Sequence, residues 1–334
     1  MIMESSHIAH DVARVLNSTQ KDSPGKVQLH VFDDAVTGRE DRASIDKETL
    51  SPAQLEVVAL EVALNAAALI RRRRAELADE HGHVGVLGTK TSEVDPVTEV
   101  DQASEKLIRE QLVERVPGSR VLGEESGLSD GDCAGDGAGG EVLWIVDPID
   151  GTVNFLYGVP AYAVSIAAVV DGQPVAGVVV DVKAGEAYVA HAGGPARRLS
   201  GAGSAGEGGE EVLRVVPAQA EASLGRALVA TGFSYVAEDR RRQAERLTRL
   251  LPRVRDIRRI GSAALDLCRV ASGEVDAYFE HGLGPWDHAA GALIAARAGA
   301  IVAAPDYAVM KEEKALVMAV KPGVAVELAE LLAD

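Results

Sequence analysis

Two carboxylates on either side of a tight turn are the part of this sequence best suited to chemistry. Asp147 and Asp150 belong to the stretch DPIDGT, residues 147–152, which directly follows the apolar run 142–146. That run predicts a buried strand with Asp147 at its exposed end, and the proline fixes the turn that follows. Such a turn can gather hard oxygen ligands for Mg²⁺, including the Ile149 carbonyl, beside backbone N–H groups able to receive phosphate. Because Asp-Pro and Asp-Gly pairs are common turn formers, a purely structural turn is the alternative.

Three more acids stand where the chain changes direction. Glu124 follows a short apolar pair, Glu280 follows an apolar strand-like segment, and Asp287 opens a helical pattern after a Gly- and Pro-rich turn. The ordinary interpretations are a solvated loop charge for Glu124, an exposed strand end for Glu280 and a helix N-cap for Asp287. Taken one at a time, these acids therefore predict no active site.

The composition of the chain indicates a globular protein and disfavours a nucleic-acid partner. The chain has 334 residues, of which 47% are hydrophobic, so it is long and apolar enough for a globular fold with a large core. Its net charge of -17 argues against a nucleic-acid-binding surface, which needs clustered Lys and Arg. Cys133 and Cys268 show neither a disulfide framework nor zinc-ligand spacing. With no signal-peptide or membrane-spanning pattern, we expect a cytoplasmic protein.

The first half of the chain must place the DPIDGT stretch. Residues 1–50 are polar and predict a poorly ordered N-terminal extension. Ser51 can cap a long amphipathic helix, with proline at its first position and Gln54 completing a capping box. A second helix is expected from Thr98, after a Gly-containing segment. From residue 162 to residue 190, apolar runs broken by turn residues predict antiparallel strands.

The second half has a different rhythm, in which short strands alternate with helical patterns. We therefore expect an N-terminal α+β half, residues 51–195, that carries the metal site, and a C-terminal α/β half, residues 196–334, that completes the substrate pocket. No internal repeat and no long linker separates them. The two halves are expected to form one compact body.

Four sequence segments, taken together, resemble the signature motifs of the inositol monophosphatase family in order and spacing. They are DPVTEVD (95–101), GEES (123–126), WIVDPIDGTVN (144–154) and WDHAAG (286–291). The resemblance covers about residues 55 to 325. Segments 153–160 and 258–266 are especially similar to the actinobacterial SuhB-type inositol-1-monophosphatases. The implied fold is α+β, the layered αβαβα sandwich of the sugar-phosphatase superfamily that also includes fructose-1,6-bisphosphatase.

The resemblance also implies a metal site with two or three Mg²⁺ ions. One ion is expected at Glu124, Asp147 and the Ile149 carbonyl, and a second at Asp147, Asp150 and Asp287. A third, weaker ion involves Glu124 and water. Cations at these places would screen the charge of a phosphate monoester and make the attacking water more acidic.

Further site residues follow from the same resemblance. Asp101 is implied to pair with Thr152 and to orient its hydroxyl toward the attacking water, with Glu124 as a third catalytic residue. The sequence alone gives Asp101 a competing role as capping-box partner of Thr98, and the two roles are compatible. Lys90 matches a lysine on a mobile loop near the metals, although a solvated cation is the alternative. The implied substrate contacts are Asp150, Gly151, Thr152, Gly261, Ser262, Ala263, Glu280 and Asp287.

The function implied is that of a phosphoric monoester hydrolase, in which a metal-activated water converts inositol 1-phosphate, or a related polyol or sugar monophosphate, to the free polyol and phosphate. The alternatives are another substrate, namely histidinol phosphate, fructose 1,6-bisphosphate or 3'-phosphoadenosine 5'-phosphate, or a regulatory protein-binding role. We expect a lithium-sensitive homodimer that acts on a small molecule, with no membrane or nucleic-acid partner.

Overall fold

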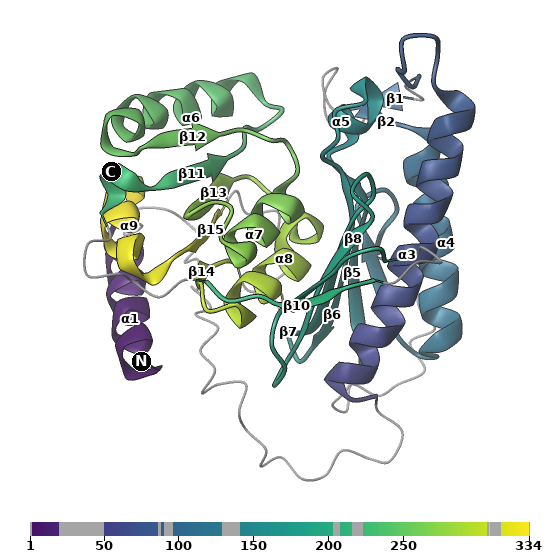
Figure 1. The fold of residues 1–334 in the computed structure, drawn as a ribbon, viewed down its shortest axis with the longest axis horizontal. Coiled ribbons are helices and arrows are strands. Elements are labelled where there is room, and N and C mark those ends of the chain that lie inside the picture. Colours follow the sequence, from purple (N-terminus) through teal and green to yellow (C-terminus); the bar gives the residue numbers. More distant parts are fainter. Residues whose placement is uncertain are drawn as a thin grey trace.

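The computed structural model describes residues 2–19, 50–85, 88–89, 96–128, 141–202, 208–215, 223–305, 307 and 315–333. In these parts of the chain, helices and sheets alternate in layers (Figure 1). One pair of helices covers the outer face of a large sheet, a second pair lies between the two sheets, and further helices cover the far face of the smaller sheet. The αβαβα sandwich expected from the sequence is confirmed.

The first layer consists of α3 (Pro52–Leu77) and α4 (Glu99–Arg115). Both begin as their sequences predict. The Ser51 hydroxyl accepts from Gln54 N at 3.3 Å, and Ser51 N donates to the Gln54 side chain at 2.9 Å. Among the described helices, α3 is the one long and apolar enough to cross a membrane, but its buried residues pack on the sheet. In this fold it is a core helix.

The larger sheet has the strand order β10-β9-β8-β7-β6-β5-β3-β4. Its pairs are antiparallel except β3 with β5, which run parallel. The predicted antiparallel meander is confirmed in β6 to β8. The strands are β3 (Arg120–Gly123), β4 (Gly127–Leu128), β5 (Leu143–Asp150), β6 (Ala163–Val170), β7 (Gln173–Asp181), β8 (Glu186–His191), β9 (Arg197–Leu199) and β10 (Glu210–Val212). A separate hairpin pairs β1 (Gly88–Thr89) with β2 (Pro96–Val97), and the short helix α5 (Thr152–Tyr157) follows β5.

The smaller sheet has the order β12-β11-β13-β15-β14 and mixes parallel and antiparallel pairs. Its strands are β11 (Leu228–Thr231), β12 (Asp256–Arg258), β13 (Ala277–His281), β14 (Ile301–Ala303) and β15 (Leu316–Val320). Strand β15 was not predicted from the sequence, because its five buried residues form an apolar run too short to be distinguished from a helix segment by periodicity.

The middle layer is formed by α7 (Ala263–Ser272) and α8 (Pro285–Arg297), which pack against each other and against both sheets. Their apolar side chains belong to a core cluster that includes Ile145 and Val179 of the first half and Val317 of the second. One core is therefore shared by residues from both halves of the chain.

The outer layer holds α6 (Ala237–Leu250), α9 (Ala325–Ala333) and the N-terminal helix α1 (Ile2–Thr19). The expectation of a poorly ordered extension is wrong for residues 2–19, because α1 packs against α9 and β14. Its buried residues Ala9, Val12 and Leu16 recur at helical spacing, a pattern that the many polar residues between them conceal. Three short 3-10 helices complete the described structure: η1 (Leu224–Arg226), η2 (Leu251–Arg253) and η3 (Pro322–Val324).

Candidate metal centre

The DPIDGT stretch forms the end of β5 and its passage into α5. In a regular strand, side chains three residues apart point to opposite faces of the sheet. The pairing of β5 with β6 is irregular between Asp147 and Asp150, and this bulge lets both carboxylates face the same side. Asp147 is only 1% exposed, so the prediction that it lies at an exposed strand end is wrong: β5 continues through the turn to Asp150.

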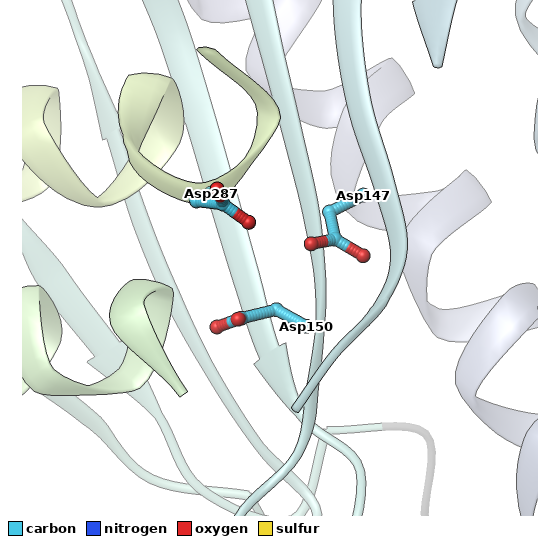
Figure 2. A group of neighbouring side chains, drawn as sticks. All are labelled: Asp147, Asp150 and Asp287. Carbon is cyan, nitrogen blue, oxygen red and sulfur yellow. The ribbon is translucent and has the colours of Figure 1, made fainter. Parts of the chain in front are cut away.

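A third carboxylate comes from the first turn of α8. One oxygen from each of Asp147, Asp150 and Asp287 lies within 4.8 Å of the other two (Figure 2). Figure 2 shows the carboxylates of Asp147 and Asp287 pointing toward each other, with Asp150 alongside. The start of α8 is tied to the sheet by Ser165, whose hydroxyl donates to the Trp286 carbonyl at 3.2 Å. The structure thus gathers three of the acids that the sequence singled out.

Asp150 is held by the start of α7. It accepts hydrogen bonds from the Ser262 hydroxyl at 2.5 Å, from Ala264 N at 2.8 Å and from Ala263 N at 3.3 Å. Burial raises the pKa of Asp150 to about 6, although these three donors oppose the shift. The predicted substrate contacts at Ser262 and Ala263 therefore serve a carboxylate of the cluster in this structure.

Asp287 is in a more repulsive setting. Within the described residues it accepts one hydrogen bond, from Gly284 N at 2.7 Å. Burial raises its pKa well above the usual range, and the negative charges of Glu124 and Asp150 raise it further. A divalent cation among these oxygens would remove the repulsion, so the donor set fits a hard metal ion.

Glu124 lies beside this group without belonging to it. The side chain is half-buried, and its backbone N–H donates to the Val146 carbonyl at 3.2 Å, next to Asp147. The backbone of Glu124 is therefore fixed beside the residue that precedes Asp147, at the edge of the centre.

Asp101 caps α4 and also contacts Thr152, so the two contacts expected from the sequence occur together. One carboxylate oxygen accepts from Thr98 N at 2.8 Å and from the Thr98 hydroxyl, which closes the capping box of α4. The other lies 3.2 Å from the Thr152 hydroxyl, which also lies 3.1 Å from the Ile149 carbonyl. Thr152 is thus fixed between α4 and the bulged strand.

The other residues predicted to bind substrate or metal lie in different parts of the structure. Gly151 has φ +95°, and a Cβ there would lie 2.9 Å from the Ala161 carbonyl, so this position requires glycine. Glu280 accepts from the Tyr278 hydroxyl at 2.8 Å, and burial raises its pKa to about 7. Gly261 lies next to the start of α7. Lys90 falls outside the described residues.

Asn154 and Asp266, to which the sequence assigned no role, also lie beside the centre. Asn154 donates to the carbonyls of Ala161 and Ile260, both at 2.8 Å, and so joins α5 to the loop before α7. Asp266 is buried near Asp150 and pairs with Arg269 at 2.9 Å, yet burial raises its pKa to about 7. Both lie in segments that resemble the family, but no local signal distinguishes a buried Asp or Asn on a helix from an exposed one, so their contacts required the structure.

Comparison with known proteins adds family information to this geometry. Residues 51–333 match the model of the inositol monophosphatase family. The chain is 48% identical over 277 residues to an inositol-1-monophosphatase of Mycobacterium leprae, covering 82% of this chain and 91% of that protein. The structure of Mycobacterium tuberculosis SuhB superposes with a TM-score of 0.67 at 45% identity, covering 84% of this chain and 96% of that one. The Nus factor SuhB of Pseudomonas aeruginosa is 39% identical over 215 residues, which is 62% of this chain and 72% of that protein.

Proposed function

The chain belongs to the inositol monophosphatase family, and on that premise we propose that it is a Mg²⁺-dependent phosphatase that hydrolyses inositol 1-phosphate or a related polyol or sugar monophosphate. The observation that carries the proposal is the group of Asp147, Asp150 and Asp287, whose oxygens lie within 4.8 Å of one another in a largely buried setting. Three acids so placed have little structural use without a cation to neutralise them.

The candidate ligands are all hard oxygen donors, as Mg²⁺ prefers. Asp147, Asp150 and Asp287 would hold one ion, and Glu124 with Asp147 and the Ile149 carbonyl would hold another. A carbonyl oxygen has two lone pairs, so the contact from Thr152 leaves Ile149 able to act as a ligand. When bound, the ions would neutralise phosphate charge and lower the pKa of the attacking water.

Thr152 and Asp101 would align that water. When the Thr152 hydroxyl donates to Asp101, its oxygen keeps lone pairs that can accept a hydrogen bond from the attacking water. Because Asp101 is also held by Thr98, the pair is oriented before substrate arrives. Preorganisation of this kind reduces the reorganisation needed at the moment of attack.

The polyol would meet carboxylates and backbone donors. Asp150, Asp287 and Glu280 would offer acceptors for sugar hydroxyls, and the backbone N–H groups of Gly151 and Thr152 would donate to the phosphate. Gly261 to Ala263 would complete the contacts. This chemistry is also compatible with histidinol phosphate, fructose 1,6-bisphosphate or 3'-phosphoadenosine 5'-phosphate, so the identity of the polyol is the finer part of the proposal.

The test is phosphate release from a panel of these monoesters with Mg²⁺ present. We expect the highest kcat/KM with inositol 1-phosphate and a severe loss of turnover in Asp147→Asn and Thr152→Ala. Asp171→Asn, a change of the same type in an exposed turn between β6 and β7, is the control and should keep wild-type turnover. Wild-type turnover in both site variants would overturn the proposal.

A regulatory protein-binding role is a second candidate, favoured by the 39% identity to a protein named as a Nus factor. The net charge of -17 disfavours direct RNA contact and leaves a protein partner. A pull-down with Asp147→Asn would separate the two functions, because retention of transcription factors by the inactive variant would show binding independent of catalysis. A cytoplasmic homodimer inhibited by lithium is the remaining part of the proposal, and sedimentation and inhibition assays test it.

A further inference from the structure

We propose that Glu105, together with Arg109, is a positioning residue that folds the β3–β4 turn and thereby fixes Glu124 at the metal centre. The inference rests on the proposed metal site but concerns residues to which the family resemblance gave no role. Glu105 is 0% exposed on α4, and its only charged partner among the described ion pairs is Arg109, at 2.9 Å. Burying such an ion pair costs desolvation free energy, which is offset only when further hydrogen bonds satisfy both charged groups.

Both oxygens of the Glu105 carboxylate accept hydrogen bonds from backbone N–H groups of the β3–β4 turn. One oxygen accepts from Glu125 N at 2.8 Å, and the other accepts from Ser126 N at 3.0 Å and from Arg109 Nε. These are the two peptide groups that follow Glu124. A carboxylate that accepts two adjacent backbone N–H groups fixes the path of the chain between them, since both bonds require one orientation of the turn.

Arg109 donates hydrogen bonds to the strands on both sides of the β3–β4 turn. Its Nη1 donates to the Val121 carbonyl of β3 at 3.1 Å, and its Nη2 donates to the Gly127 carbonyl of β4. The planar guanidinium therefore joins the strand before the turn, the strand after it and the Glu105 carboxylate. Lysine could not reproduce this fork.

Gly123 allows this close approach. A Cβ on Gly123 would lie 2.4 Å from the Glu105 carboxyl carbon, so the carboxylate rests directly on the backbone of the turn. The glycine that opens the GEES segment is thus explained by contact with Glu105.

Glu124 is consequently held from both sides. Its own N–H is bound to the Val146 carbonyl of β5, and the next N–H is bound to Glu105. The backbone of Glu124 is thereby fixed relative to β5, the strand that carries Asp147.

The same face of α4 holds two other parts of the centre. Asp101 contacts Thr152, and the Ser104 hydroxyl donates to the Pro148 carbonyl at 3.3 Å. Asp101, Ser104 and Glu105 are related by i, i+3 and i+4 spacing, so they lie on one helix face, and all three are 0% exposed. We call them the α4 polar face.

The experiment is a double-mutant cycle read by calorimetric titration of the metal-free protein with Mg²⁺. Glu105→Gln preserves side-chain volume but replaces one acceptor oxygen with a donor. We expect Mg²⁺ binding to weaken about tenfold, the scale on which residues behind metal ligands act. In the Glu124→Gln background the same change should cost less than about twofold, because the ligand that it positions is already lost. Glu110→Gln, an exposed position on the same helix, should leave binding unchanged.

Arg109→Lys gives an independent cycle and replaces Glu105→Gln if that variant does not fold. Unchanged Mg²⁺ affinity in a folded variant, or an equal loss with and without Glu124, would overturn the inference. Failure of the proposed function looks different, since wild-type protein would then bind Mg²⁺ with the predicted coupling and still hydrolyse no phosphate monoester. A wild-type protein without measurable Mg²⁺ binding would overturn both.

Discussion

The α4 polar face and the carboxylate cluster contain acids of the same type in opposite conditions. Glu105 and Asp101 are buried on α4, and each accepts several hydrogen bonds from the segments that it holds. Across the centre, Asp287 accepts one hydrogen bond within the described residues and faces other acids, and its pKa is raised. Asp101 and Glu105 are satisfied by the protein and shape it. In the cluster, Asp150 is held by three donors, whereas Asp287 is opposed by neighbouring charges that a cation would neutralise. This difference separates scaffold from reactive centre.

The largest expected effect comes from Asp287→Asn, which removes one charge from the cluster. Metal stabilisation of a phosphoryl-transfer transition state is worth several kcal/mol, so kcat/KM should fall by about 10³-fold. Because the lost charge is repelled by its neighbours, the metal-free variant should be at least as stable as wild type. Steady-state kinetics and thermal unfolding in a chelator measure the two effects. If metal-free Asp287→Asn were clearly less stable than metal-free wild type, Asp287 would be stabilising the fold as Asp101 and Glu105 do, and the comparison would fail.

Asp101→Asn should show the reverse combination. It replaces an acceptor of the Thr98 and Thr152 bonds with a donor, so both activity and stability should fall. We expect kcat to decrease by about 10²-fold and the free energy of unfolding by about 1–3 kcal/mol, the cost of leaving buried donors unpaired. Denaturant titration and kinetics at saturating Mg²⁺ test this prediction, which fails if stability is unchanged.

Ser104→Ala should have a smaller effect of the same kind. It removes one neutral hydrogen bond to the Pro148 carbonyl, with an expected cost of about 1 kcal/mol in unfolding free energy. The turn would keep its bulge, so kcat should fall only a few-fold. A loss of stability and kcat as large as that expected for Asp101→Asn would contradict this prediction, because it would show that Ser104 contributes as much as Asp101.

The smallest effect is on pH dependence. Burial raises the pKa of Glu280 to about 7 and that of Asp150 to about 6. A carboxyl group whose pKa is higher in the folded state than in the unfolded state favours folding at low pH, and this contribution is lost as pH rises from about 4 to about 7. Without metal, Glu280→Gln should therefore gain stability relative to wild type between about pH 5 and about pH 8. Equal thermal midpoint differences at the two pH values would contradict the assignment.

Local patterns predicted the elements that local physics determines. The capping boxes at Ser51 and Thr98, and the antiparallel strands between residues 162 and 190, are where the sequence places them. The acids of the centre were also identified, because their spacing matches a family. The bulge between Asp147 and Asp150 was not predicted, since it depends on pairing with β6, and Glu105 was indistinguishable from a solvated helix residue. Long-range contacts decide such features.

The most direct measurement is a crystal structure of the protein soaked with Mn²⁺, which replaces Mg²⁺ at oxygen sites and scatters anomalously. We predict an anomalous peak about 2.0–2.6 Å from oxygens of Asp147, Asp150 and Asp287. In Asp287→Asn this peak should weaken or disappear while the rest of α8 stays in place. Full Mn²⁺ occupancy elsewhere, with no peak among these three carboxylates, would contradict the account.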